Sequence, residues 1–243
     1  RLRPGQRPRR PRRLRSAAVI VSAFAAFLAL MTGAENILLS LPVSARTSAL
    51  LRNSAGSVSN MLPLRRRRVR SSTVGEAMKP TQAALTAALR HQRYRREDIG
   101  RDRHSGAAAS APSDPAPFGP VINLMMFTQQ ISFGGVTGQV QVLTTGPTSE
   151  LAINVYPGSI GSLPRIDFEG NSTAYSHDKL GAHHRWFIAF LDTFAAADSS
   201  TAIADLGLFL PGERTGFVPA SGAADCPPSS IPKRWRCEQT NGR

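Results

Sequence analysis

The sequence lacks the local patterns that identify most enzymes and nucleotide-binding proteins. No G-x-G-x-x-G or G-x-x-x-x-G-K-[ST] segment is present to surround a phosphate with backbone N–H groups. The G-x-S-x-G elbow of serine hydrolases is absent as well. These absences predict no cofactor and no catalytic residue, and they favour a non-catalytic protein.

Acidic residues are scarce in the first part of the chain. Residues 1–103 hold 22 of the 30 Lys and Arg residues but only 5 of the 16 Asp and Glu residues, and no acid occurs between Asn36 and Gly75. A nucleic-acid-binding domain would carry its positive charge on the folded surface. Here the charge belongs to the front of the chain, so nucleic acid is not the expected partner.

Charge of either sign is missing from Ala17 to Gly33, a mainly apolar run that follows an arginine-rich head. As a helix, a run of this length would span roughly 25 Å, which is marginal for crossing a bilayer. The run predicts a membrane-targeting helix, with a soluble core helix as the alternative. Two forms of targeting remain open: a signal peptide cleaved near Ala45, or an uncleaved transmembrane anchor.

The segment that follows the apolar run is rich in Arg and Ser and poor in acids, which is typical of an organellar transit peptide. A signal peptide followed by a transit peptide predicts import into a plastid. The expected protein is therefore an accessory or structural subunit of a plastid or thylakoid membrane complex, with the membrane and other subunits as partners. The alternative is a single-pass protein of the secretory or plasma membrane, whose outward-facing β-rich domain binds or hydrolyses a carbohydrate or lipid.

Composition divides the chain into six segments. A basic helix is expected within the third segment, over Thr81–Asp98, because Ala and Leu favour helices and Gly100 follows. The predicted segments are a head with the apolar run (1–45), a transit-like segment (46–75), the basic helix (76–100), an Ala/Pro/Ser linker (101–117), a β-rich domain (118–220) and a C-terminal tail (221–243).

Short apolar runs separated by Gly and Pro predict strands in the β-rich domain. Trp186–Ala197 reads better as a helix, because it is long and rich in alanine. The fold class expected is therefore α+β, with a sandwich-like sheet and one packed helix, and an all-β sandwich is the alternative. The expected strands are 121–127, 131–133, 138–144, 151–156, 165–169 and 204–210.

Titratable side chains gather in one place, around His177, His183 and His184. Their spacing matches no zinc pattern, so they are weak metal candidates and the expected metal content is none. We interpret them as polar loop residues that precede Trp186. Asp167 and Glu169 alternate along an expected strand, so both should point to one face of the sheet.

Two further sites depend on where the protein resides. Cys226 and Cys237 are spaced to close a small disulfide loop, worth roughly 3 kcal/mol, although two free thiols are an equal alternative. Asn171 begins an Asn-Ser-Thr sequon, which predicts glycosylation if the domain faces the lumen.

Overall fold

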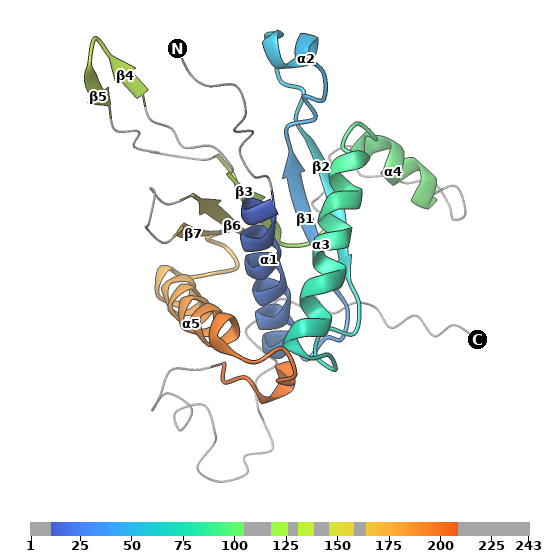
Figure 1. Ribbon diagram of the computed structural model, residues 1–243, viewed down its shortest axis with the longest axis vertical. Helices are drawn as coiled ribbons and strands as arrows, with labels where there is room; N and C mark the ends of the chain where they lie inside the picture. The colour runs from blue at the N-terminus through green and yellow to red at the C-terminus, as the bar shows by residue number, and fades with distance from the viewer. Residues whose placement is uncertain (1–10, 105–117, 126–130, 139–145, 158–163, 209–243) are drawn as a thin grey trace.

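The computed structural model describes residues 11–104, 118–125, 131–138, 146–157 and 164–208 (Figure 1). These ranges form a five-stranded sheet with helices against one face, together with a separate two-stranded hairpin. The elements are α1 (Pro11–Thr32), β1 (Ile37–Val43), α2 (Ala49–Asn53), β2 (Asn60–Arg66), α3 (Val74–Arg90), α4 (Arg96–His104), β3 (Val121–Leu124), β4 (Ile131–Phe133), β5 (Val136–Gly138), β6 (Leu151–Tyr156), β7 (Arg165–Gly170), α5 (His177–Ala196) and a 3₁₀ turn, η1 (Ile203–Asp205).

The sheet is mixed, with strand order β2-β1-β3-β6-β7. Its two outer pairs, β1 with β2 and β6 with β7, are antiparallel, whereas β3 pairs in parallel with β1 on one side and with β6 on the other. Strands from the front of the chain and from its second half therefore hydrogen-bond in one sheet. The small hairpin of β4 and β5 turns through Gly134 and Gly135, which both have positive φ.

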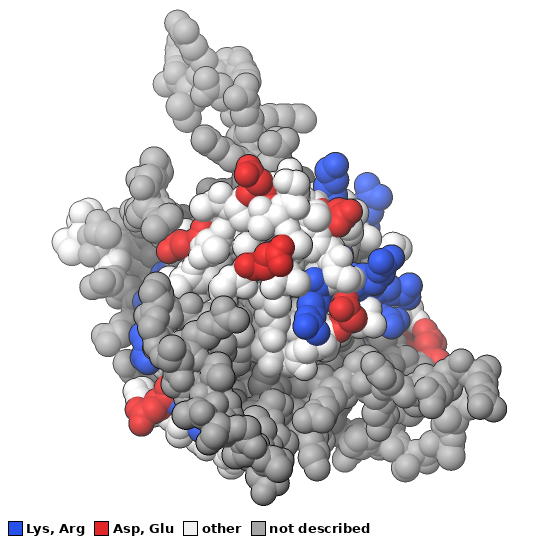
Figure 2. Space-filling view, turned by 90° about the horizontal axis from the view of Figure 1, so that it is seen from below, with Lys and Arg blue, Asp and Glu red and all other residues white. Residues whose placement is uncertain are grey.

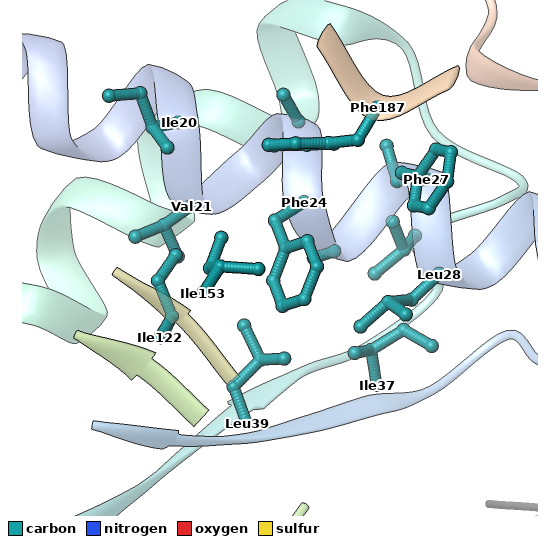
Figure 3. Packing of buried hydrophobic residues seen from close by; sticks show 14 of the residues in the cluster. Ile20, Val21, Phe24, Phe27, Leu28, Ile37, Leu39, Ile122, Ile153 and Phe187 are labelled. Atoms are coloured by element: carbon teal, nitrogen blue, oxygen red, sulfur yellow. The ribbon is translucent and has the colours of Figure 1, made fainter. Parts of the chain in front are cut away.

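Helix α1 fills the centre of the layer that covers the sheet, between α3 and α5 (Figure 1). Every second residue of the strands points toward it, including Leu39, Ile122 and Ile153, each with no exposed surface. From α1, Val21 and Phe24 point into the same cluster (Figure 3). The ring of Phe24 meets that of Phe187 in α5 edge to face, with centroids 5.4 Å apart.

Capping side chains explain where two of these helices begin. Thr73 and Glu76 form a capping box at the start of α3, each satisfying a backbone N–H of the other. Ser176 accepts a hydrogen bond from the Lys179 N–H at the start of α5. Pro80 lies inside α3 instead of preceding a helix, so the predicted start at Thr81 is too late.

The predicted membrane helix is wrong. No helix among the described residues combines the length and the apolarity that crossing a membrane requires. The run Ala17–Gly33 lies mostly in α1, where residues 17, 18 and 20–29 are buried by protein. Burial inside a protein, like burial in lipid, favours apolar side chains all around a helix.

The transit-peptide interpretation is also wrong, because the Arg-rich and acid-poor composition belongs to folded helices and strands. Residues 46–75 supply α2 and β2, with apolar side chains of β2 in the core and most of the segment's arginines at the surface, although Arg66 is buried. Seen from below, most of the visible Lys and Arg side chains lie at the right, with Asp and Glu side chains among them, and a few more lie at the lower left (Figure 2). The exposed arginines that end or follow β2 are Arg65, Arg67, Arg68 and Arg70.

The predicted fold class, a small sandwich with one packed helix, is wrong as well. The sheet is a single mixed layer, and α1, α3 and α5 all pack on one face of it. Several elements were predicted in the right place: β6, β7 and the helix within α5. The strand expected over 204–210 is not formed where the structure describes it: residues 204–205 belong to η1, and 206–208 are in no helix or strand. The helix expected over 81–98 is interrupted between α3 and α4.

Replacing Phe24 with alanine should destabilise the protein by about 3–5 kcal/mol, because the side chain is fully buried where α1 meets the sheet and α5. Chemical denaturation followed by circular dichroism measures this loss. Leu50→Ala serves as the control, because Leu50 is 78% exposed and its loss should change the unfolding free energy by less than about 0.5 kcal/mol. Equal effects of the two substitutions would contradict the buried position of α1.

Gly119→Ala should weaken the junction of β1 and β3. A Cβ atom at Gly119 would lie 2.0 Å from the Leu38 carbonyl oxygen, so the backbone would have to move. We expect a loss of roughly 1–3 kcal/mol in the free energy of unfolding. Gly207→Ala is the matched control, since a Cβ there meets nothing within 4 Å; a loss as large in this control would refute the explanation.

Candidate functional site

The sheet face opposite α1, α3 and α5 carries a row of polar side chains. Because side chains alternate along a strand, Asn123, Asn154 and Asp167 point away from the buried Ile122, Ile153 and Ile166. The strand register places Asn123 beside Asn154, and Asn154 beside Asp167. Three strands thus align their polar residues at one level of the sheet.

Hydrogen bonds connect this row across the strands. The Asn123 side-chain amide donates to Oδ1 of Asn154 over 2.9 Å, and the Asn154 amide donates to Oε1 of Glu169 over 2.6 Å. Asn154 is only 5% exposed, whereas Asn123 and Glu169 are half-buried. A buried amide with both ends bonded has one fixed orientation, so the row presents its polar atoms in a defined pattern.

A second polar group adjoins the row on β6 and β7. Arg165 donates to both carboxylate oxygens of Asp167, over 2.8 and 2.6 Å, and its guanidinium lies over the Tyr156 ring. Burial, followed by the charges of Asp167 and Glu169, raises the pKa of Tyr156 above its ordinary value. The phenol therefore stays protonated at neutral pH and can donate a hydrogen bond.

These groups can bind and orient a polar substrate, but they include no activated nucleophile. Ser40 lies on the same face, yet it is fully buried and its hydroxyl donates to the Gly119 carbonyl oxygen. Among the described residues of this face, the chemistry available is hydrogen bonding from amides and a phenol, and charge from carboxylates. The arrangement suits a substrate rich in amide or ester carbonyl groups.

The three histidines belong to α5, not to a loop, and two of them pack that helix. His183 is buried between the rings of Tyr175 and Trp186, and Nε2 of His184 lies 3.0 Å from the Ile166 carbonyl oxygen. His177 is the first residue of the helix and is exposed. In the ranges that the structure describes, no group of three or more His, Cys, Asp or Glu residues could hold a metal ion.

The remaining sequence candidates stay predictions. Asn171 follows β7 at the surface, where its side chain donates to the Ser149 carbonyl oxygen and accepts from Thr173, and nothing tests its glycosylation. Cys226 and Cys237 lie outside the described residues, so their disulfide is untested too.

Comparison with known proteins identifies the family. The family model described as "Condensation domain" matches residues 13–215, which is most of the chain. The chain belongs to the condensation-domain family. The match includes α1 and the strands β1 and β2, the same part of the chain that had been interpreted as targeting sequence.

The curated relatives are long synthetases of which this chain matches a small part. The dimodular nonribosomal peptide synthase of Bacillus subtilis (strain 168) is 33% identical over 200 residues, which cover 82% of this chain and 8% of that protein. Enterobactin synthase component F of Escherichia coli O157:H7 is 35% identical over 158 residues, covering 65% of this chain and 12% of that protein.

Solved condensation domains share the fold. A mutant of the starter condensation domain of rhizomide synthetase, in complex with C8-CoA, superposes with a TM-score of 0.72 at 35% identity. The first condensation domain of the calcium-dependent antibiotic synthetase, in complex with a substrate analogue, gives 0.67 at 31%. Both matches cover 82% of this chain, but the chain spans only 45% and 44% of those two solved chains.

Family membership overturns the functional predictions made from the apolar run. The predicted subunit of a plastid or thylakoid membrane complex is wrong, and so is the alternative of a single-pass membrane protein with an outward-facing domain, because the chain belongs to a family of peptide synthetase domains. The predicted partners are wrong too, namely a membrane and the subunits of a membrane complex. The predicted membrane localisation is also wrong. All of these followed from treating a core helix as a membrane segment.

The sequence revealed only part of the polar row in this condensation-domain chain. The alternation of Asp167 and Glu169 indicated that they share a face, and the structure confirms it through β7. Asn123 and Asn154 were missed, because a single asparagine in an apolar strand carries no local signal of function. Only the pairing of β3 with β6 shows that the two amides meet.

Acidification should destabilise the fold through His183. Burial, and secondarily the charge of Lys179, lowers the pKa of His183 in the folded state below the ordinary value of 6.5. As the pH falls below about 6.5, the unfolded chain binds a proton that the folded chain does not, so stability decreases toward the lower folded-state pKa. Between pH 7.5 and 5.5, the free energy of unfolding should fall less in His183→Leu than in the wild-type protein, as measured by chemical denaturation. An identical fall in the two proteins would contradict this assignment.

Proposed function

We propose that this chain is part of a condensation domain that forms amide bonds in a nonribosomal peptide synthetase. Its substrates would be an acyl or peptidyl thioester and an aminoacyl thioester, each held on the pantetheine arm of a carrier domain. The observation that carries the proposal is the family match over residues 13–215, joined by relatives that are peptide synthetases. The C8-CoA bound by the rhizomide domain is a thioester of the same kind.

The proposed reaction needs no cofactor. The neutral amino group of one substrate attacks the thioester carbonyl carbon of the other, so a C–N bond forms and the C–S bond breaks. The sulfur leaves and ends as a thiol, and the attacking nitrogen gives up one proton. The products are an amide and a free pantetheine thiol, which balances the atoms of the two substrates.

In this reaction we assign the polar row of Asn123, Asn154 and Glu169 a positioning role. Both substrates carry amide or thioester carbonyl groups, which match the hydrogen-bonding atoms of the row. Holding two reacting groups in line raises the rate by removing the entropy cost of their encounter. Because the chain spans 45% of the solved rhizomide domain, we assign it one wall of the reaction site rather than the whole site.

Amide formation by the full protein that contains this chain tests the proposal. The protein is mixed with an acyl and an aminoacyl thioester of N-acetylcysteamine, and the amide is measured by mass spectrometry. Asn154→Ala should lower kcat/KM roughly tenfold to a hundredfold, because the row loses its central bonds and the substrates lose alignment.

The control for this assay is Asp192→Asn, at an exposed site on α5, which should keep the wild-type rate. Thermal unfolding of each variant shows whether the fold is retained. Absence of amide product from the wild-type protein across a series of acyl and aminoacyl thioesters would overturn the proposed function. Full activity in a folded Asn154→Ala variant would show that the polar row does not position the substrates.

A further inference from the structure

The polar row has a direction, which Glu169 sets at one end. An ionised carboxylate has only acceptor atoms, whereas a carboxamide has an acceptor oxygen on one branch and a donor nitrogen on the other. The group of Asn154 that faces Glu169 over 2.6 Å must therefore be its NH2. The oxygen of Asn154 is then directed to the other side, toward Asn123 on β3.

The same constraint passes to Asn123. Because the Asn154 oxygen can only accept, Asn123 must present its amide nitrogen to it, over 2.9 Å. Burial strengthens this constraint, since Asn154 is almost fully buried and the reversed orientation would leave its polar atoms without bonds. A carboxylate on β7 thus fixes the orientation of an amide on β3, although β6 lies between the two strands.

The row ends in an acceptor atom, the side-chain oxygen of Asn123. The nitrogen of this amide is used by Asn154, so Oδ1 lies on the branch that points away from β6. No residue within the described ranges donates a hydrogen bond to this oxygen, and it is not one of the unpaired polar atoms that are buried there. An accessible acceptor in a fixed position is suited to an N–H donor and not to a carbonyl group.

We propose that Oδ1 of Asn123 accepts a hydrogen bond from the attacking amino group of the aminoacyl thioester, and that Glu169 is the positioning residue that keeps this oxygen in place. The inference rests on the proposed function, which supplies such an amine. A neutral amine with one N–H bound to a fixed acceptor can direct its lone pair toward the thioester carbonyl carbon of the other substrate. The carboxamide orients the amine and takes no proton from it.

Loss of the direction of the row should weaken the aminoacyl substrate alone. In E169Q the end of the row can donate or accept, so the amides of Asn123 and Asn154 can turn together and present NH2 to the amine. In the thioester assay described above, KM for the aminoacyl thioester should rise about tenfold, as expected for the loss of one hydrogen bond. KM for the acyl thioester should stay unchanged. An equal rise for both substrates, or no rise for the aminoacyl thioester, would overturn the inference.

A second substitution at the other end of the row should rescue E169Q. N123D introduces a group that only accepts, so Asn154 turns its NH2 toward β3 and its oxygen toward the amide introduced by E169Q. N123D/E169Q therefore keeps the net charge, the two hydrogen bonds and an acceptor at the end of the row. Its KM for the aminoacyl thioester should be within about threefold of wild type, whereas N123D alone should raise this KM about tenfold or more. A loss in the double variant equal to the product of the two single losses would overturn the inference.

Hydrogen exchange measures the direction of the row without turnover. Exchange of peptides that contain β3 and β6, followed by mass spectrometry, reports local opening of these strands in the full protein. N123D places a carboxylate at each end of one amide, so exchange there should be faster by about tenfold or more. Adding E169Q should restore the slower exchange.

The matched control for this rescue is N123D/D167N. Asp167 lies on the same face of β7, but it is bonded to Arg165 and not to Asn154. D167N removes the same charge as E169Q and should leave the fast exchange of N123D in place. Equal rescue by D167N would show repulsion between charges instead of amide orientation, and would overturn the inference.

The two readouts separate this inference from the proposed function. Amide formation by the wild-type protein with an unchanged KM in E169Q would overturn the contact between Asn123 and the amine, and would leave the proposed function standing. Rescue of exchange without any effect on KM would make the row a structural network only, which also overturns the inference. Absence of amide product from the wild-type protein would overturn both together.

Discussion

Burial of α1 is the constraint on which the rest of the structure depends. The helix lies against the sheet and between α3 and α5, so its residues 17, 18 and 20–29 are buried. Phe24 and Phe27 both contact Phe187, which ties α1 to α5. Fully burying each of these side chains contributes about 1.5–3 kcal/mol, so the three helices and the sheet are stabilised as one unit.

The mixed sheet follows from that packing. Strand β3 lies between β1 and β6, which brings the first and second halves of the chain together at the centre of the sheet. Gly119 permits the close approach, since any side chain there would collide with the Leu38 carbonyl group. The same pairing places Asn123 beside Asn154, so the polar row is a product of the sheet topology.

Asparagine holds distant segments together in the same physical way at two places. Asn154 is bonded at both ends within the row, and Asn60 connects the start of β2 to the α3–α4 turn. A carboxamide can donate and accept at once, so one side chain can hold two neighbouring segments in fixed relation. For the function proposed above, the alignment of two thioesters, this rigidity matters because the rate depends on geometry.

The sequence by itself determined several local elements: β6 and β7, the helix within α5, and the shared face of Asp167 and Glu169. Each depends on alternation, on helix propensity or on capping, which act over a few residues. Only the tertiary structure decided that Ala17–Gly33 is a core helix, because burial in protein and burial in lipid select the same apolar residues. It alone also brought Asn123 to Asn154 and Asn60 to the α3–α4 turn, since contacts between distant segments depend on strand order and leave no local pattern in the sequence.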